Sequence, residues 1–137
     1  MEGQCLCGQI HFTFEPNNNV AMNCHCSICR RSHGANYATQ LFSKKSSLNI
    51  VKGKNLLKEF NSSTYGIRVF CGHCGSRLMN YAAEKSDYMS VALACITTAH
   101  TIKASAHVQV ASKAPWVTPN EKIPSFNEFP EDIGQYF

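Results

Sequence analysis

The sequence predicts an all-β fold built from short strands. Residues 9–15 (QIHFTFE) alternate apolar and polar side chains, which is the period of a half-buried strand. Similar short runs recur between turn residues along the chain, and no long stretch shows helical spacing. We therefore expect a sheet protein whose functional groups lie on loops.

The remaining elements are predicted from local patterns. The residues PNNN at 16–19 predict a turn. A short helix is expected after Ser27, because closely spaced thiolates often lie at the start of a helical turn, where free amide groups face the sulfur atoms. The prolines from Pro115 onward cannot pair in a central strand and predict an irregular C-terminal tail. Further strands are predicted over residues 36–42, 47–51, 56–60, 65–70, 77–81, 88–96 and 106–110.

Length and composition favour one domain over residues 1–137. A chain of 137 residues with 44% hydrophobic residues can bury one ordinary core. No apolar run approaches the roughly 20 residues that span a bilayer, and the stretch MEGQCLCGQI lacks the features of a signal peptide, so we expect a cytoplasmic protein. The net charge is +4, but the basic residues are scattered, which argues against nucleic acid as a partner.

The eight cysteines indicate metal ligands, because disulfides are rare in a reducing compartment. Cys71 and Cys74 lie in CGHCG, whose two-residue gap and glycines are typical of a zinc knuckle. Cys5 and Cys7 lie in CLCG and can reach one ion only at a bend, which Gly8 would permit. Together the two pairs predict a closed four-thiolate zinc site with a structural role.

The stretch NCHCSIC contains three further cysteines: Cys24, Cys26 and Cys29. A tetrahedral metal site needs four ligands, and no further cysteine pair is left to supply the fourth. One interpretation is a second zinc site whose fourth position is open to water or substrate, as in catalytic zinc sites. An iron–sulfur cluster is an alternative that the colour of the protein would reveal.

Cys95 and the nearby histidines are weaker candidates for this site. Cys95 could be a fourth ligand, but a core position is favoured, because a strand would place it on the same face as Met89, Val91 and Leu93. His25 and His73 lie between cysteines and are expected to turn away from the metal. His33 could support a ligand or face the substrate.

Four motifs together resemble a known family. They are GxCxCG at 3–8, CHCxxCR at 24–30 followed by Gly34, FCGxCGS at 70–76, and HVxxxSKxPW at 107–116. This order is similar to that of the glutathione-dependent formaldehyde-activating enzymes, which include centromere protein V-like members. The resemblance implies a folded-sheet architecture of the β-tent type with two zinc ions per chain. It assigns the structural ion to Cys5, Cys7, Cys71 and Cys74, and the second, catalytic ion to Cys24, Cys26 and Cys29.

The activity implied by this resemblance is a carbon–sulfur lyase reaction. The family joins formaldehyde to the thiol of glutathione, which gives S-hydroxymethylglutathione, and the reverse reaction breaks the carbon–sulfur bond. We expect action on this adduct or on a related small thiol or aldehyde. Three thiolates and a divalent ion carry a formal charge of −1, so the site suits capture of a thiol better than polarisation of an aldehyde. A non-catalytic zinc module that binds a thiol, a protein or nucleic acid is the alternative.

Basic residues near the second site are candidates for binding glutathione, which has two carboxylates. Arg30 is the first candidate, and Arg31 and Lys113 could also pair with a carboxylate or could be ordinary surface charges. Trp116 could wall a pocket, but a core position under the tail is favoured.

Overall fold

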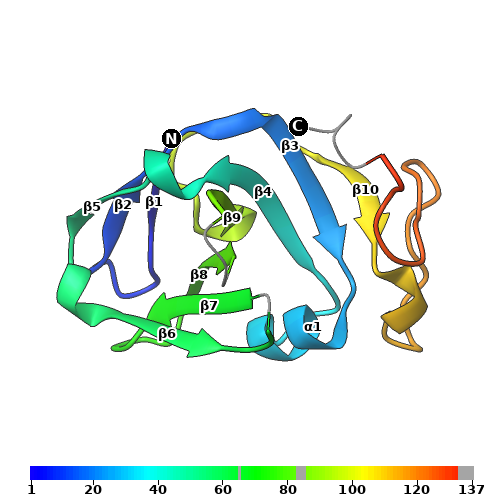
Figure 1. Cartoon of the computed structure of the whole chain (residues 1–137), viewed down its shortest axis with the longest axis horizontal. Helices are drawn as coiled ribbons and strands as arrows, with labels where there is room; N and C mark the ends of the chain where they lie inside the picture. Colours follow the sequence, from blue (N-terminus) through cyan, green and yellow to red (C-terminus); the bar gives the residue numbers. More distant parts are fainter. Residues whose placement is uncertain (65, 83–85, 133–137) are drawn as a thin grey trace.

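The computed structural model describes residues 1–64, 66–82 and 86–132, which form two sheets and a short α-helix (Figure 1). The smaller sheet is antiparallel with the order β1-β2-β5, and its strands are β1 (Glu2–Gln4), β2 (His11–Thr13) and β5 (Asn49–Lys52). The larger sheet has the order β10-β3-β4-β9-β8-β7-β6. Its strands are β3 (Pro16–Cys24), β4 (Ala38–Lys44), β6 (Leu57–Asn61), β7 (Gly66–Cys71), β8 (Arg77–Ala82), β9 (Tyr88–Ala92) and β10 (Ala104–Val108).

The larger sheet is antiparallel except where β10 pairs in parallel with β3. In Figure 1, β3 and β4 slope away from β6 and β7, and α1 (Ser27–His33) lies at the end of β3 between these two parts of the sheet. Four 3-10 turns complete the described elements: η1 (Lys45–Ser47), η2 (Lys54–Leu56), η3 (Leu93–Cys95) and η4 (Val110–Ser112). No helix in the described part of the chain has the length and apolar character needed to cross a bilayer. The mostly β, folded-sheet prediction is confirmed.

Each predicted strand overlaps an observed strand, although the bounds differ: the strand predicted over 9–15 is only His11–Thr13, and the one predicted over 106–110 ends at Val108. The strand predicted over 88–96 ends at Ala92, where the chain turns into η3. Of the strand predicted over 65–70, residue Tyr65 lies outside the described residues. The predicted helix after Ser27 is confirmed, because α1 begins at that residue.

The turn predicted over residues 16–19 is wrong. These residues form the first part of β3, and the register between β3 and β4 shifts between Pro16 and Ala21. Asn18 and Asn19 adopt the left-handed conformation, with φ values of 52° and 55°. The turn-forming residues therefore produce a bulge inside a strand and do not end it.

The core consists of two clusters of apolar side chains. The larger one lies between the two sheets and includes Phe12, Phe14 and Leu41, all almost completely buried. The smaller one lies on β3, β4 and β10 and consists of Met22, Phe42, Ala106 and Val108. The tail residues beyond η4 are irregular, as predicted, and they cover the edge of β10, where Phe126 donates a backbone hydrogen bond to His107.

A glycine between the two sheets gives a test of this packing. Gly53 has φ +80°, and an added Cβ would overlap the carbonyl oxygen of Gln9. Gly53→Ala should therefore lower the free energy of unfolding by roughly 2–4 kcal/mol, through steric overlap and left-handed strain together. Gly34→Ala is the matched control, because Gly34 has φ +59° and no neighbour within 4 Å of the added atom, so about 1–2 kcal/mol is expected. The free energies of unfolding are measured in urea. An equal loss in Gly53→Ala and Gly34→Ala would show that the backbone near Gln9 shifts to make room for the added Cβ at no cost in free energy.

Candidate metal sites and the adjoining cavity

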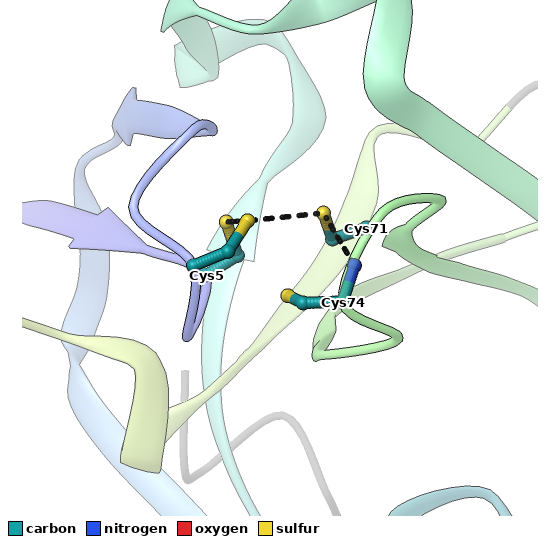
Figure 2. Close-up of side chains that lie close together, drawn as sticks. Cys5, Cys71 and Cys74 are labelled. Carbon is teal, nitrogen blue, oxygen red and sulfur yellow. Dashed lines mark hydrogen bonds between the residues drawn. The ribbon is translucent and has the colours of Figure 1, made fainter.

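Two turns bring four cysteines together at one end of the core: Cys5, Cys7, Cys71 and Cys74. Their sulfur atoms all lie within 4.8 Å of one another. The Sγ atoms of Cys5 and Cys7 are 3.4 Å apart, and those of Cys7 and Cys71 are 3.9 Å apart. A tetrahedral zinc ion with four sulfur ligands holds them about 3.8 Å apart, so this four-thiol group fits zinc. Figure 2 shows Cys5 facing Cys71 and Cys74 across the space between the two turns.

Each turn closes through a glycine and directs amide groups at sulfur. Gly8 and Gly75 have φ values of +73° and +78°, so the bend expected at Gly8 is present. The amide of Ile10 donates to the Sγ of Cys5, at 3.3 Å, and the amide of Cys74 donates to the Sγ of Cys71, at 3.5 Å. These are the knuckles expected from the spacing of the cysteines.

Polar neighbours favour the thiolate form of Cys5 and Cys74, whereas the neighbouring thiols raise the pKa of Cys7. Hydrogen bonds from the side chain and the amide of Ser76 lower the pKa of Cys74 to about 5. Burial is the largest single influence on Cys5 and opposes its ionisation, but hydrogen bonds from the Ile10 amide and from the thiols of Cys7 and Cys71 together lower its pKa. Because metal ligands must be deprotonated, this environment suits a bound cation.

A second group of three cysteines lies where β3 meets α1: Cys24, Cys26 and Cys29. Cys24 ends β3, Cys26 is the N-cap of α1, and the amide of Cys29 donates to the Sγ of Cys26 at 3.2 Å. These three sulfur atoms also lie within 4.8 Å of one another. The side chains of Cys24 and Cys29 lower the pKa of Cys26 to about 2. The pKa values of Cys24 and Cys29 are raised, so only Cys26 favours the thiolate form, and it is the spacing of this three-thiol group that fits zinc.

The three-thiol group lines a cavity of about 410 Å³. This volume lies within the roughly 300–1,000 Å³ of small-molecule sites. Part of the lining is apolar and includes three residues of the smaller core cluster, and the rest includes several polar side chains. Apolar side chains on the lining include Met22, Phe42, Val108 and Phe129, and polar ones include Gln40, Arg68, Asn80, Tyr88 and Ser90.

The polar lining is held by its own hydrogen bonds. The side-chain amide of Asn80 donates to Gln40 Oε1 at 3.1 Å and to Ser90 Oγ at 3.0 Å. Gln40 in turn lies 3.2 Å from Nε2 of His33. Burial, followed by the charges of nearby arginines, lowers the pKa of His33 to about 4, so its ring is neutral at pH 7. His33 thus supports Gln40 on the cavity lining, whereas the sequence led us to expect it to support a metal ligand or to face the substrate.

The other histidines lie outside both cysteine groups. His25 is fully buried, and its Nε2 lies 2.9 Å from Nδ1 of His107. Burial lowers the pKa of His25 to about 4, and its Nδ1 has no hydrogen-bond partner among the described residues. His73 is exposed. Both His25 and His73 thus turn away from the thiols, as expected.

Cys95 also lies outside both groups. It packs against the larger core cluster, and its Sγ donates to the carbonyl oxygen of Arg77 at 3.0 Å. Burial raises the pKa of Cys95 to about 11. The favoured core position is confirmed, although it is reached through η3 and not through a continued strand.

None of the basic and aromatic residues considered as substrate contacts from the sequence lines the cavity. Arg30 does not line the cavity, because its guanidinium donates to the carbonyl oxygens of His25, at 3.3 Å, and Ser112, at 3.0 Å. The core position favoured for Trp116 is wrong, since 73% of the residue is exposed and its Nε1 donates to Asn36. Arg31 and Lys113 also lie off the cavity lining.

Arg68 was not anticipated from the sequence. It lies on β7, lines the cavity and directs its NH1 at the Sγ of Cys29, at 3.8 Å. In the run YGIRVF it reads as an ordinary strand residue, and the contact with Cys29 joins positions 39 apart in the chain. No local signal marks such a residue.

Comparisons with known proteins place the chain in a family. The family model described as "Glutathione-dependent formaldehyde-activating enzyme" matches residues 1–112. A protein of Schizosaccharomyces pombe named "Uncharacterized lyase" is 31% identical over 88 residues, which cover 64% of this chain and 62% of that protein. A Halomonas elongata protein named "Putative glutathione-dependent formaldehyde-activating enzyme" is 32% identical over 85 residues, which cover 57% of this chain and 54% of that protein.

The fold is shared with a solved structure as well. The crystal structure of a Rhodobacter sphaeroides protein superposes with a TM-score of 0.62 at 24% identity, and the match covers 92% of this chain and 100% of that one. The chain thus spans somewhat more than half the length of the two curated relatives and the whole of this structural neighbour. The extent of the family match establishes that this chain belongs to the family of glutathione-dependent formaldehyde-activating enzymes.

Proposed function

We propose that this chain is a zinc-dependent carbon–sulfur lyase that acts on the adduct of glutathione and formaldehyde, or on an adduct of a related small thiol or aldehyde. The observation that carries the proposal is the three-thiol group of Cys24, Cys26 and Cys29 on the lining of a cavity of ligand size. Three protein ligands leave one position of a tetrahedral zinc ion open, which is the arrangement of catalytic sites.

The two cysteine groups would have different roles. The four-thiol group offers a complete ligand set, so we assign it a structural zinc ion. The three-thiol group would hold the second ion, with Cys24, Cys26 and Cys29 as its catalytic ligands. A zinc ion with an open position supplies deprotonation of a bound thiol at neutral pH. Eight free cysteines suit a reducing compartment, and we propose the cytoplasm.

The residues around the three-thiol group would then orient the reactants. Arg68 offsets negative charge at Cys29. The apolar side chains of Met22, Phe42 and Val108 exclude water from their part of the cavity. This favours the adduct, because water competes with a thiol for the aldehyde carbon.

Hydroxyl groups in the cavity can donate hydrogen bonds to the aldehyde oxygen. When the thiolate sulfur forms a bond to the aldehyde carbon, the carbonyl electron pair moves to oxygen, which must be stabilised and protonated. Tyr88 and Ser90 both line the cavity. Burial raises the pKa of Tyr88 to about 12, so its hydroxyl keeps its proton at neutral pH and can donate a hydrogen bond. The proton is recovered from solvent, and the reverse sequence breaks the carbon–sulfur bond.

The proposal can be tested with protein that carries cobalt(II) in place of zinc. Addition of glutathione should change the sulfur-to-cobalt absorption, and the zinc protein should speed both formation and breakdown of S-hydroxymethylglutathione above the spontaneous rates. Metal content per chain, measured with and without glutathione, reports whether both sites are filled. Binding of glutathione without any rate increase would instead support the non-catalytic thiol-binding module. A salt-dependent shift of labelled nucleic acid in the absence of glutathione binding would support the nucleic-acid alternative.

A further inference from the structure

A second concave site lies beside the cavity. It is a groove of about 580 Å³ lined by residues of α1, β6, β7 and β8. Three of the four arginines in the chain line it, together with three apolar side chains. We call it the arginine groove, and the residues that matter here are Arg31, Arg68, Arg77, Ile28, Phe60 and Phe70.

The arginine groove has an excess of positive charge. No carboxylate among the described residues lines it. Arg77 is held in place, because its guanidinium donates to Ser32 Oγ, to the carbonyl oxygen of Val69 and to Asn80 Oδ1. Burial first, and then the charge of Arg68, lower the pKa of Arg77 to about 10, so the guanidinium groups of Arg68 and Arg77 repel one another. An anion in the groove would relieve this repulsion.

Arg31 and Arg68 have donors to offer such an anion. Arg31 is exposed at the groove, and its guanidinium makes no hydrogen bond or ion pair with any described residue. Arg68 uses its Nε on Ser62 Oγ, at 2.8 Å, and directs NH1 at Cys29 at the longer distance of 3.8 Å. Planar guanidinium groups bind carboxylates through paired hydrogen bonds, which makes a carboxylate the natural ligand.

Arg68 also connects the groove to the three-thiol group. Its Nε faces Ser62, which lines the groove, and its NH1 faces Cys29, which lines the cavity. A molecule with sulfur beside Cys29 and a carboxylate in the groove would therefore lie across a single guanidinium.

We infer that the arginine groove binds a carboxylate carried by the same thiol whose sulfur lies at Cys24, Cys26 and Cys29, an inference that rests on the function proposed above. The substrate class is then thiols with a carboxylate-bearing arm, and neutral thiols are disfavoured. Arg31 and Arg68 bind the carboxylate, and Ile28, Phe60 and Phe70 contact the apolar atoms of the arm. Phe60 is 64% exposed and is thus available for such a contact.

Calorimetric titration of the zinc-loaded chain tests this inference with three thiols: glutathione, its diethyl ester and 2-mercaptoethanol. Glutathione should bind at least tenfold more tightly than the diester, whose carboxylates are blocked. Arg31→Gln should weaken glutathione binding roughly tenfold, the size expected for loss of one charged hydrogen-bonding partner, and should leave binding of 2-mercaptoethanol unchanged. Lys52→Gln, on an exposed position of β5, is the matched control and should change neither affinity.

The outcomes separate this inference from the proposed function. Equal affinities for glutathione and its diester, or an Arg31→Gln variant that binds glutathione like the parent, would overturn the carboxylate subsite while thiol binding itself still stands. Failure of all three thiols to bind would overturn the proposed function, and the subsite with it. Loss of 2-mercaptoethanol binding in Arg31→Gln would also contradict the subsite, because it would place Arg31 at the sulfur and not at the arm.

Discussion

Replacing Cys71 by alanine should leave a chain without a cooperative unfolding transition. Cys71 is completely buried, and the four-thiol group joins the turn after β1 to the turn between β7 and β8. Binding of a structural zinc ion contributes on the order of 10 kcal/mol, which matches the roughly 5–15 kcal/mol stability of a whole domain. Thermal melting followed by circular dichroism, together with zinc content, measures the effect. Cys74→Ala should behave in the same way.

The control for this experiment is another cysteine in the same core. Cys95→Ala removes a thiol that packs against the larger core cluster and makes one hydrogen bond to Arg77, so the variant should lose only about 1–2 kcal/mol and keep its zinc. A melting temperature of Cys74→Ala near that of the parent would contradict the structural role of the four-thiol group. The division between the two cysteine groups would then be wrong.

The cysteine groups could be predicted from sequence because short turns determine them. Two-residue and one-residue gaps next to Gly8 and Gly75 leave the chain few ways to bend, and the structure shows both glycines with positive φ. The two distant pairs could be joined into one group because two pairs supply the four ligands of a tetrahedral ion, and the family resemblance implied the same division. The start of α1 followed from the same logic, since its N-cap is Cys26.

The second half of β3 was not predicted because its apolar and polar residues do not alternate. Ala21, Met22 and Asn23 are buried in succession. Ala21 belongs to the larger core cluster and Met22 to the smaller one, so both faces of this strand are covered. A strand buried on both sides loses the period of two on which the other predictions depend.

Residues around the cavity were hardest to predict because tertiary contacts alone give them a role. Arg30 follows the last cysteine of its motif, yet its guanidinium holds backbone carbonyls. Arg68 is distant from Cys29 in sequence, and the two meet because the fold brings β7 close to α1. Charge type can be read from a sequence, but the direction of a long side chain depends on which strand lies opposite.

Replacing Cys26 by alanine should keep the fold, lower the zinc content by about one ion per chain and abolish thiol-dependent activity. Cys26 is partly exposed and caps α1 through the amide of Cys29, so the cost to stability is about 1 kcal/mol, the usual value of an N-cap. Loss of one of three ligands leaves too few thiolates to retain zinc. Zinc content per chain, thermal melting and the rate of adduct formation from glutathione and formaldehyde are measured on the same preparation.

Two matched variants separate the ligand role of Cys26 from its capping role. Cys26→Ser keeps an oxygen that caps a helix well, so it should regain the lost stability but still lack one zinc ion, because a serine hydroxyl is not ionised at neutral pH. Cys95→Ala should keep both ions, since its sulfur lies outside the three-thiol group. Equal zinc loss in Cys95→Ala and Cys26→Ala would mean that Cys95 completes a closed four-thiolate cage. A closed cage has no position for an external thiol, and the chain would then be a binding module and not a lyase.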